Sequence, residues 1–315
     1  MAAGIEAMNA EHWASQNERG HKFFLKLTAW MVRFLPPPLM RIATAAVCSY
    51  FYLTAARQRR CIRNYQQRLA AAFPNAAMPS FLPVYRQFLA FGEAIADRFA
   101  VWQHKIRYSD LVLDDSDNLY QDIRTHHARG QILICSHLGN IEICRALVGH
   151  HTGFKMNVLV HSRHAQAFNQ ALKEAGASDI NLIQVEDLDA AAMLSLANRL
   201  DAGEWLAVAA DRVPVRGEKT VSVDFLGHPA RLPQGAWLMA HLLKAKTNTV
   251  FVLKKQGRYH LILRRFADVP NWKRSERNEQ IALQVQRYAD ELAARAADVP
   301  LQWFNFYDFW ADSET

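Results

Sequence analysis

The stretch that decides the fold is residues 131–147, QILICSHLGNIEICRAL, in which an apolar run leads to a histidine. Glu142 follows His137 by five residues. On a single helix, five residues turn through about 500°, so the two side chains would point about 140° apart. They can meet only if a strand ends near the histidine and a helix begins before the glutamate. The stretch therefore predicts a strand–turn–helix junction.

Such a junction would allow the histidine and the glutamate to act together in acid–base chemistry. Gly139 permits a tight turn, Asn140 is a good N-cap, and Glu142 then stands in the first helical turn. A glutamate there can accept a hydrogen bond from one imidazole nitrogen and leave the other nitrogen as a base. That base would take the proton of an alcohol that attacks a thioester, without an acyl-enzyme. The spacing taken alone favours a core histidine beside a capping glutamate, because both residue types are common and the pattern is loose.

Apolar strands and amphipathic helices alternate along the rest of the chain. Strands are expected at 131–136, 156–161, 180–185, 204–210, 220–227, 248–255 and 258–266, and helices at 84–103, 140–150, 164–176, 189–203, 234–246 and 275–297. This predicts an α/β fold with a mixed, largely parallel central sheet and helices on both faces. Ligands bind at the carboxyl ends of strands in such sheets, and His137 and Asp211 each follow a predicted strand. We expect the two to share one sheet edge.

The N-terminal part of the chain favours contact with a membrane. Residues 42–56 form an uncharged run of 15 residues that is flanked by arginines, whereas a span needs roughly 20 apolar residues. We expect two helical segments around the prolines at 36–38, acting as an interfacial membrane anchor. A buried helical hairpin is the alternative. Residues 1–75 would form this membrane-associating region, and residues 84–315 the α/β domain.

Charge and composition restrict the partners. The 315-residue chain is half apolar and has a formal net charge of +7, which favours an anionic lipid surface, an acidic carrier protein or nucleic acid. The basic residues are dispersed and form no nucleic-acid-binding motif, so no nucleic acid is expected. The 13 histidines and four cysteines show no metal-ligand spacing, so no metal or other cofactor is expected either.

Several segments carry a family resemblance. SHLGNIEI at 136–143 resembles the H-x4-D/E block of the lysophospholipid acyltransferase superfamily, in the branch that contains the lipid A late acyltransferases. Further segments that are similar to this branch follow in the expected order: NERGHKFFLKL, SYFYLTAARQRRCIRNYQQRL, VLVHSRHAQAFNQAL, EWLAVAADRVPV, SVDFLGHPARLPQGAWLMAHLLKA and VPLQWFNFYDFW. The resemblance covers most of the chain.

The resemblance implies an acyltransferase at the cytoplasmic face of a bacterial inner membrane. It would move a fatty acyl group from acyl-carrier protein, or from acyl-CoA, to a hydroxyl of a membrane lipid or glycolipid. His137 would be the base and Glu142 its partner in catalysis. The substrate-binding candidates are Asp211 and Arg212, which match the second charged block, together with Asn140, Arg163 and Arg231.

The closing segment departs from the family. The lipid A enzymes usually carry a His-Arg-Arg-Phe-like segment there, and this chain has Phe306-Tyr307-Asp308-Phe309-Trp310. The acceptor could therefore be another product, such as an aryl polyene.

Two more distant alternatives remain. A glycosyltransferase would use the D-x-D of Asp115 and Asp117, although a turn with capping carboxylates explains that pattern as well. A basic membrane-binding protein would keep its ligand without His137, whereas the enzyme would lose turnover.

Overall fold

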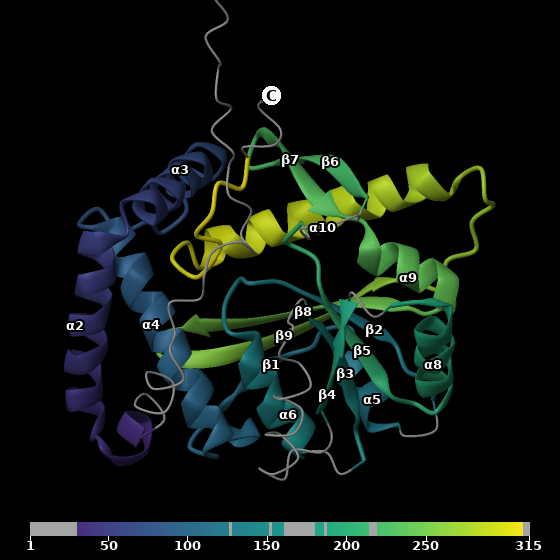
Figure 1. The fold of residues 1–315 in the computed structure, drawn as a ribbon, viewed down its shortest axis with the longest axis horizontal. Helices are drawn as coiled ribbons and strands as arrows, with labels where there is room; N and C mark the ends of the chain where they lie inside the picture. Colours follow the sequence, from purple (N-terminus) through teal and green to yellow (C-terminus); the bar gives the residue numbers. More distant parts are fainter. Residues whose placement is uncertain are drawn as a thin grey trace, which may run out of the picture.

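The computed structural model describes residues 30–125, 128–150, 153–160, 180–185, 188–213 and 219–310. Its centre is a seven-stranded sheet in the order β1-β9-β8-β2-β5-β3-β4 (Figure 1). The strands are β1 (Val112–Asp114), β2 (Ile132–Cys135), β3 (Met156–Val160), β4 (Ile180–Gln184), β5 (Trp205–Ala209), β8 (Thr247–Lys255) and β9 (Arg258–Ala267). The pairs from β8 to β4 are parallel, β9 is antiparallel to β8, and β1 is parallel to β9, so β1 and β9 run opposite to the other five strands. The predicted mixed, largely parallel sheet is confirmed.

Helices cover both faces of this sheet. They are α4 (Pro83–Trp102), α5 (Leu119–Arg124), α6 (Cys144–His150), α8 (Ala190–Asp201), α9 (Gly235–Leu243) and α10 (Arg277–Asp298), with the 3-10 turns η2 (Tyr108–Asp110) and η3 (Ile141–Ile143). The central strand β2 is buried throughout, and its residues alternate between two cores. Ile132 and Ile134 pack with residues of α8, α9 and α10, whereas Leu133 and Cys135 pack with residues of α5 and α6. Burial on both faces explains why this strand reads as a continuous apolar run.

One expected strand lies outside the main sheet. Residues 220–227 do form β6 (Thr220–Phe225), but β6 pairs antiparallel with β7 (His228–Pro233) in a separate two-stranded ribbon beside α10. The sequence did not predict β7, because β7 contains two prolines. Proline has no backbone N–H to donate to a neighbouring strand, and within sheets it is confined to edge strands, strand starts and bulges. The predicted hairpin of β8 and β9 is confirmed, and Gln256 and Gly257 at its turn have φ of 49° and 80°.

The N-terminal helices differ from the expectation. The chain bends by 95° at Ala55, between α2 (Pro37–Thr54) and α3 (Ala56–Ala72). The expected break at the triple proline is also present, because a helical stretch at 30–34 ends before Pro36 and α2 begins at Pro37, where proline is tolerated. The second break, at Ala55, was not predicted. Neither helix by itself is long and apolar enough to cross a membrane; only the bent pair taken together passes that test.

Both helices pack on the α/β part of the molecule. A Cβ built at Gly92 of α4 would lie 2.5 Å from the Cys48 Sγ of α2, so a glycine is needed for the two helices to approach this closely. From α3, Tyr65 and Leu69 enter the same core as the main sheet. The N-terminal helices are thus continuous with the packing that surrounds the sheet.

The predicted junction at residues 135–144 is confirmed, with a 3-10 turn at its start. β2 ends at Cys135, Gly139 adopts a φ of +76°, and η3 leads directly into α6. The Asn140 N–H donates to the Val252 carbonyl of β8 at 2.9 Å, and a Cβ on Gly139 would lie 2.0 Å from that carbonyl oxygen. Only glycine fits this approach.

Replacing Gly139 is expected to destabilise the fold through two additive effects. Gly139→Ala places a side chain in the left-handed region, at about 1–2 kcal/mol, and adds a steric clash worth about 1–3 kcal/mol. Gly227→Ala is the matched control, because its φ is +75° and nothing lies within 4 Å of its Cβ. Urea unfolding of both variants measures the difference, and equal losses of unfolding free energy would show that the clash does not exist.

Candidate active site

The site forms where β2 and β5 end side by side. These strands are parallel neighbours with Cys135 opposite Ala209, so the two residues beyond each strand emerge at the same edge of the sheet. They bring His137 and Asp211 into contact, with 2.8 Å between Nδ1 and Oδ1. The expectation that these two residues share one edge is confirmed.

Asp211 is a fully buried carboxylate with a complete set of donors. Its Oδ2 accepts hydrogen bonds from the His137 backbone N–H at 2.9 Å, from Trp303 Nε1 at 3.1 Å and from Asn305 Nδ2 at 3.0 Å. Its side chain has 0% exposure. Burial raises the pKa of Asp211, but the His137 imidazole, the charge of Arg212 and the His137 backbone N–H outweigh it and lower that pKa to about 2. The carboxylate is therefore ionised and accepts only.

The ionised Asp211 defines the tautomer of His137. An acceptor at Oδ1 requires the proton on Nδ1, which leaves Nε2 with its lone pair. The imidazole keeps 36% exposure, and its Nδ1 edge faces a buried partner, so the accessible edge carries Nε2. Desolvation lowers the pKa of His137, and the charges of Arg212 and Arg98 lower it further, against the opposing effect of Asp211. At neutral pH, His137 therefore presents an unprotonated nitrogen.

The structure corrects the expected pairing of His137 with Glu142. Glu142 Oε2 accepts from Arg145 Nε at 2.5 Å, and no hydrogen bond or ion pair joins it to His137 within the described residues. The reason is local: η3 places Glu142 and Arg145 three residues apart on one face, and a guanidinium is a stronger partner than a neutral imidazole. Burial raises the pKa of Glu142, but Arg145 and Arg98 hold it below its usual value.

The other residues predicted to bind substrate do not all lie beside His137. Arg212 follows Asp211, and its Nε and Nη2 donate to Asn305 Oδ1 and to the Phe304 carbonyl at 2.6 and 3.0 Å. Asn140 holds the N-cap position, yet its side chain makes no cap and donates instead to the Ala94 carbonyl of α4 at 2.8 Å. Arg231 is exposed on the β6–β7 ribbon, and Arg163 lies outside the described residues.

Three residues of the site escaped the sequence analysis. Trp303 and Asn305 come from the C-terminal segment, which is tied to the motif because the Phe304 N–H donates to the His137 carbonyl at 3.0 Å. Arg98 reaches the site from α4, and its charge lowers the pKa of both His137 and Glu142. The closing segment VPLQWFNFYDFW, noted for its family resemblance, was the one signal that could have indicated the first two.

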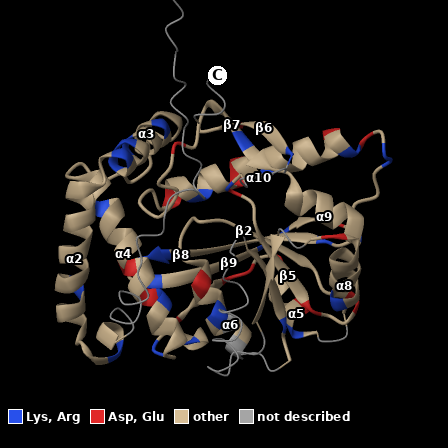
Figure 2. Ribbon diagram, in the orientation of Figure 1, with Lys and Arg blue, Asp and Glu red and all other residues tan. Residues whose placement is uncertain are grey.

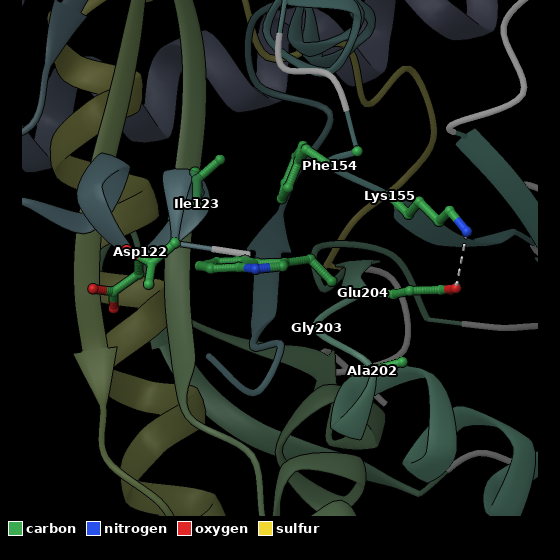
Figure 3. Close-up of a pocket in the computed structure, with 10 residues that line it drawn as sticks. Asp122, Ile123, Phe154, Lys155, Ala202, Gly203 and Glu204 are labelled. Carbon is green, nitrogen blue, oxygen red and sulfur yellow. Dashed lines mark ion pairs between the residues drawn. The ribbon is translucent and has the colours of Figure 1, made fainter. Parts of the chain in front are cut away.

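A separate cavity of about 160 Å³ lies at the opposite edge of the sheet (Figure 3). Its lining includes Lys155, just before β3, and Glu204, just before β5, and these side chains form an ion pair at 4.0 Å. Parallel strands start at this edge and end at the other, so the cavity is remote from His137. It does not belong to the site.

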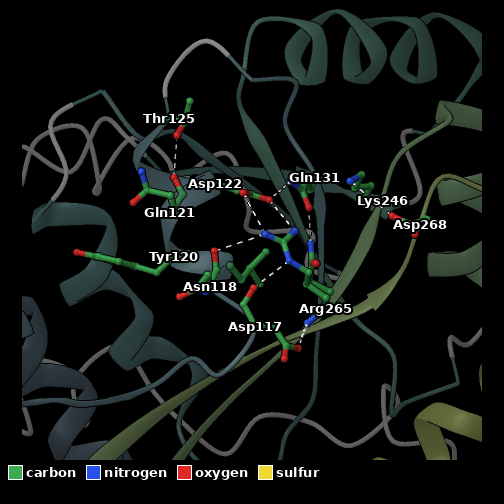
Figure 4. A network of polar contacts seen from close by, with 12 residues as sticks. Asp117, Asn118, Tyr120, Gln121, Asp122, Thr125, Gln131, Lys246, Arg265 and Asp268 are labelled. Atoms are coloured by element: carbon green, nitrogen blue, oxygen red, sulfur yellow. Dashed lines mark hydrogen bonds and ion pairs between the residues drawn. The ribbon is translucent and has the colours of Figure 1, made fainter.

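The two aspartates of the D-x-D pattern accept hydrogen bonds from backbone N–H groups and so stabilise the fold. Asp115 accepts from the backbone N–H groups of Leu119 and Tyr120 at the start of α5, and Asp117 accepts from the Arg265 N–H at 2.8 Å (Figure 4). Both carboxylates are occupied, and the described residues contain no group of His, Cys, Asp and Glu that could hold a metal ion. This removes the observation that had favoured a glycosyltransferase.

Asp211→Asn is expected to reverse the tautomer of His137. Three donors surround the Oδ2 position, so the amide oxygen must take that place and the amide NH₂ must face Nδ1. The ring then carries its proton on Nε2, and loss of the negative charge lowers its pKa further. Nitrogen-15 NMR of the histidines, with the His137 signal assigned by a His137→Gln variant, measures both effects. Asp201→Asn, at an exposed ion pair, is the control, and an unchanged tautomer in Asp211→Asn would contradict the pairing.

Comparison of the sequence with known proteins identifies its family. No curated protein matched the chain. The family described as bacterial lipid A biosynthesis acyltransferase matches residues 12–311, which include β2, β5, the histidine motif and the C-terminal segment. Because the match covers nearly the whole chain, the protein belongs to the bacterial lipid A biosynthesis acyltransferase family and is an acyltransferase.

Proposed function

We propose that this acyltransferase moves a fatty acyl group from an acyl thioester, carried by acyl-carrier protein, to a hydroxyl of a membrane lipid or glycolipid. His137 acts as the general base, and Asp211 orients it. The single observation that carries the proposal is the hydrogen bond between Nδ1 and the ionised Asp211, which leaves Nε2 unprotonated at the exposed edge of the ring. Glu142 was predicted as the orienting partner but is bonded to Arg145, so in this proposal it contributes only its charge, beside Arg145 and Arg98.

The reaction follows from this geometry in two proton transfers. Nε2 takes the proton of the acceptor hydroxyl as its oxygen attacks the thioester carbon, and the carbonyl π electrons move to the carbonyl oxygen. The resulting imidazolium is stabilised by the Asp211 carboxylate. When the C–S bond breaks, the electron pair leaves on sulfur and the imidazolium returns the proton. The products are an ester and a thiol, and no acyl-enzyme forms.

The net charge of +7 supports an acidic carrier protein as the donor, because acyl-carrier proteins are strongly acidic. It also supports attachment to an anionic bilayer. Basic residues are frequent along α3, whereas α2 is nearly free of charged residues (Figure 2). The two helices thus offer an apolar surface beside a basic one.

The outer face of α2 is the surface that we propose to contact the membrane. Large apolar side chains are exposed there at helical spacing: Leu39 at 49%, Ile42 at 65%, Val47 at 53%, Tyr50 at 61% and Leu53 at 72%. Water-exposed apolar groups arranged in one stripe are typical of a helix that lies in the interface of a bilayer.

Aromatic contacts connect this helix with the site. Each ring in the series packs on the next with centroids 5.1–5.9 Å apart, and the last residue is the one whose N–H donates to the His137 carbonyl. The series is Tyr52, Phe88, Phe306, Phe91 and Phe304. Aromatic packing is therefore continuous from α2 to the segment that is bonded to the base, and it supports an apolar environment for an acceptor or acyl chain next to this helix.

His137→Ala is expected to abolish transfer without loss of folding. The loss should be at least the roughly 10²–10⁴-fold typical of removing a general base. The measurement is transfer of radiolabelled acyl groups from acyl-carrier protein to a total membrane lipid extract, with mass analysis of the labelled product to identify the acceptor. His260→Ala, on β9, is the control. Full activity of the His137→Ala protein would refute the mechanism.

The membrane contact has its own test. The double substitution Ile42→Glu with Leu53→Glu should lower binding to phosphatidylglycerol-containing vesicles by tenfold or more, because each apolar side chain contributes about 1.5–3 kcal/mol when it leaves water. A flotation assay measures the bound fraction. Leu194→Glu with Leu283→Glu is the matched control, since both leucines are exposed on other helices. Equal binding by both double variants would show that α2 is not the contact.

A further inference from the structure

Arg98 lies on the face of α4 that packs on the histidine motif. The Asn140 side chain donates to the Ala94 carbonyl at 2.8 Å, which ties this part of α4 to the loop between β2 and η3. Arg98 follows Ala94 by one helical turn and is therefore on the same face. Its charge lowers the pKa of both His137 and Glu142. A cation thus stands beside the base from an element that the motif itself does not include.

Arg98 has a donor without an acceptor. Its Nε is buried and has no hydrogen-bond partner among the described residues. The acidic residues next to it on α4 are engaged elsewhere: Asp97 accepts from Lys254 Nζ at 2.8 Å and from Tyr259 Oη at 2.7 Å. Buried guanidinium groups are normally paired, and an unsatisfied donor at a catalytic centre indicates a missing ligand.

The neighbouring charges of the site do not supply that ligand. Glu142 is bonded to Arg145, and Asp211 has its lone pairs filled by His137 and the C-terminal segment. Arg212, the second cation beside the imidazole, directs Nε and Nη2 to Asn305 and Phe304. Arg98 is thus the cation near His137 whose Nε donor remains available within the described residues.

Ester formation creates a negative charge close to the base. When the acceptor oxygen bonds to the thioester carbon, the carbonyl oxygen becomes an oxyanion, and this oxyanion must form within reach of the group that removes the hydroxyl proton. Donors that are already in place at that position stabilise the transition state strongly, because they need no reorganisation in a site with little water.

We propose that Arg98 is a further catalytic residue, which donates hydrogen bonds to the thioester carbonyl oxygen as it becomes an oxyanion. This rests on the proposed acyl transfer and adds a second group to its machinery. A planar guanidinium suits the task, because it presents several donors in a fixed geometry and keeps its charge at every pH of interest. The oxyanion is the acceptor that the buried Nε lacks.

The test compares Arg98→Gln and Arg98→Lys with Arg86→Gln, an exposed arginine on the same helix. The assay is transfer of labelled acyl groups from acyl-carrier protein to the membrane lipid extract under single-turnover conditions. Arg98→Gln should lose about 10²–10³-fold in rate with KM for the donor nearly unchanged, since an oxyanion contact exists only in the transition state. Arg98→Lys should recover part of that loss, and Arg86→Gln should match the wild type.

The pH profile tests whether the charge of Arg98 acts on His137, whereas the comparison of rate with KM tests the oxyanion role. Removing the Arg98 charge should raise the pKa of His137, so the acid limb of the rate profile should move to higher pH in Arg98→Gln. A normal rate in Arg98→Gln, or a raised KM with the rate preserved, would overturn the oxyanion role. Loss of activity in His137→Ala alone would then leave the proposed function intact, whereas full activity in both variants would remove the two proposals together.

Discussion

The rest of the site depends on the buried charge of Asp211. A carboxylate that is removed from water is tolerated only if hydrogen-bond donors replace the water, and four hydrogen bonds do so here. The donors come from the histidine motif and from the C-terminal segment, so one charge joins β5 to both. The same contacts that make the charge tolerable orient the imidazole. The contacts that stabilise this buried aspartate are therefore the same contacts that orient His137.

The C-terminal segment that binds Asp211 also contacts helices of the N-terminal half. Gln66 of α3 donates to Gln87 of α4 at 2.8 Å, and Gln87 donates to the Trp303 carbonyl at 2.7 Å. The ring of Tyr65 packs on Trp303 with centroids 4.9 Å apart. The tryptophan that donates to Asp211 is thus held by α3 and α4. A helix pair that offers apolar and basic surface therefore supports the Asp211 carboxylate.

Charge around the imidazole is arranged so that its neutral form prevails. Desolvation, Arg212 and Arg98 all lower the pKa of His137, and only Asp211 opposes them. A base must be unprotonated before it can act, so this balance is suited to work at neutral pH. Near the D-x-D pattern the ionisable groups stabilise the fold instead: Arg265 donates to Asp122 at 2.8 Å and to the backbone carbonyl of Asp117 at 3.0 Å (Figure 4).

The sequence by itself determined the alternation of strands and helices, the turn at Gly139, and the placement of His137 and Asp211 at the ends of strands. These follow from local periodicity and from the φ that only glycine adopts freely, both of which are properties of short segments. The sequence also indicated that one carboxylate should orient the histidine. Its local pattern pointed to Glu142, the nearest carboxylate along the chain, and that prediction was wrong.

Only the tertiary structure decided which carboxylate it is. Asp211 is 74 residues away from His137 along the chain, and Trp303 and Asn305 are more distant still. Strand order brings them together, and no local pattern encodes strand order. Glu142 does not bond His137, because it pairs with the positively charged guanidinium of Arg145, three residues further along the chain. The partner of a polar group is set by every donor that folding places within reach, and most of those donors come from other parts of the chain.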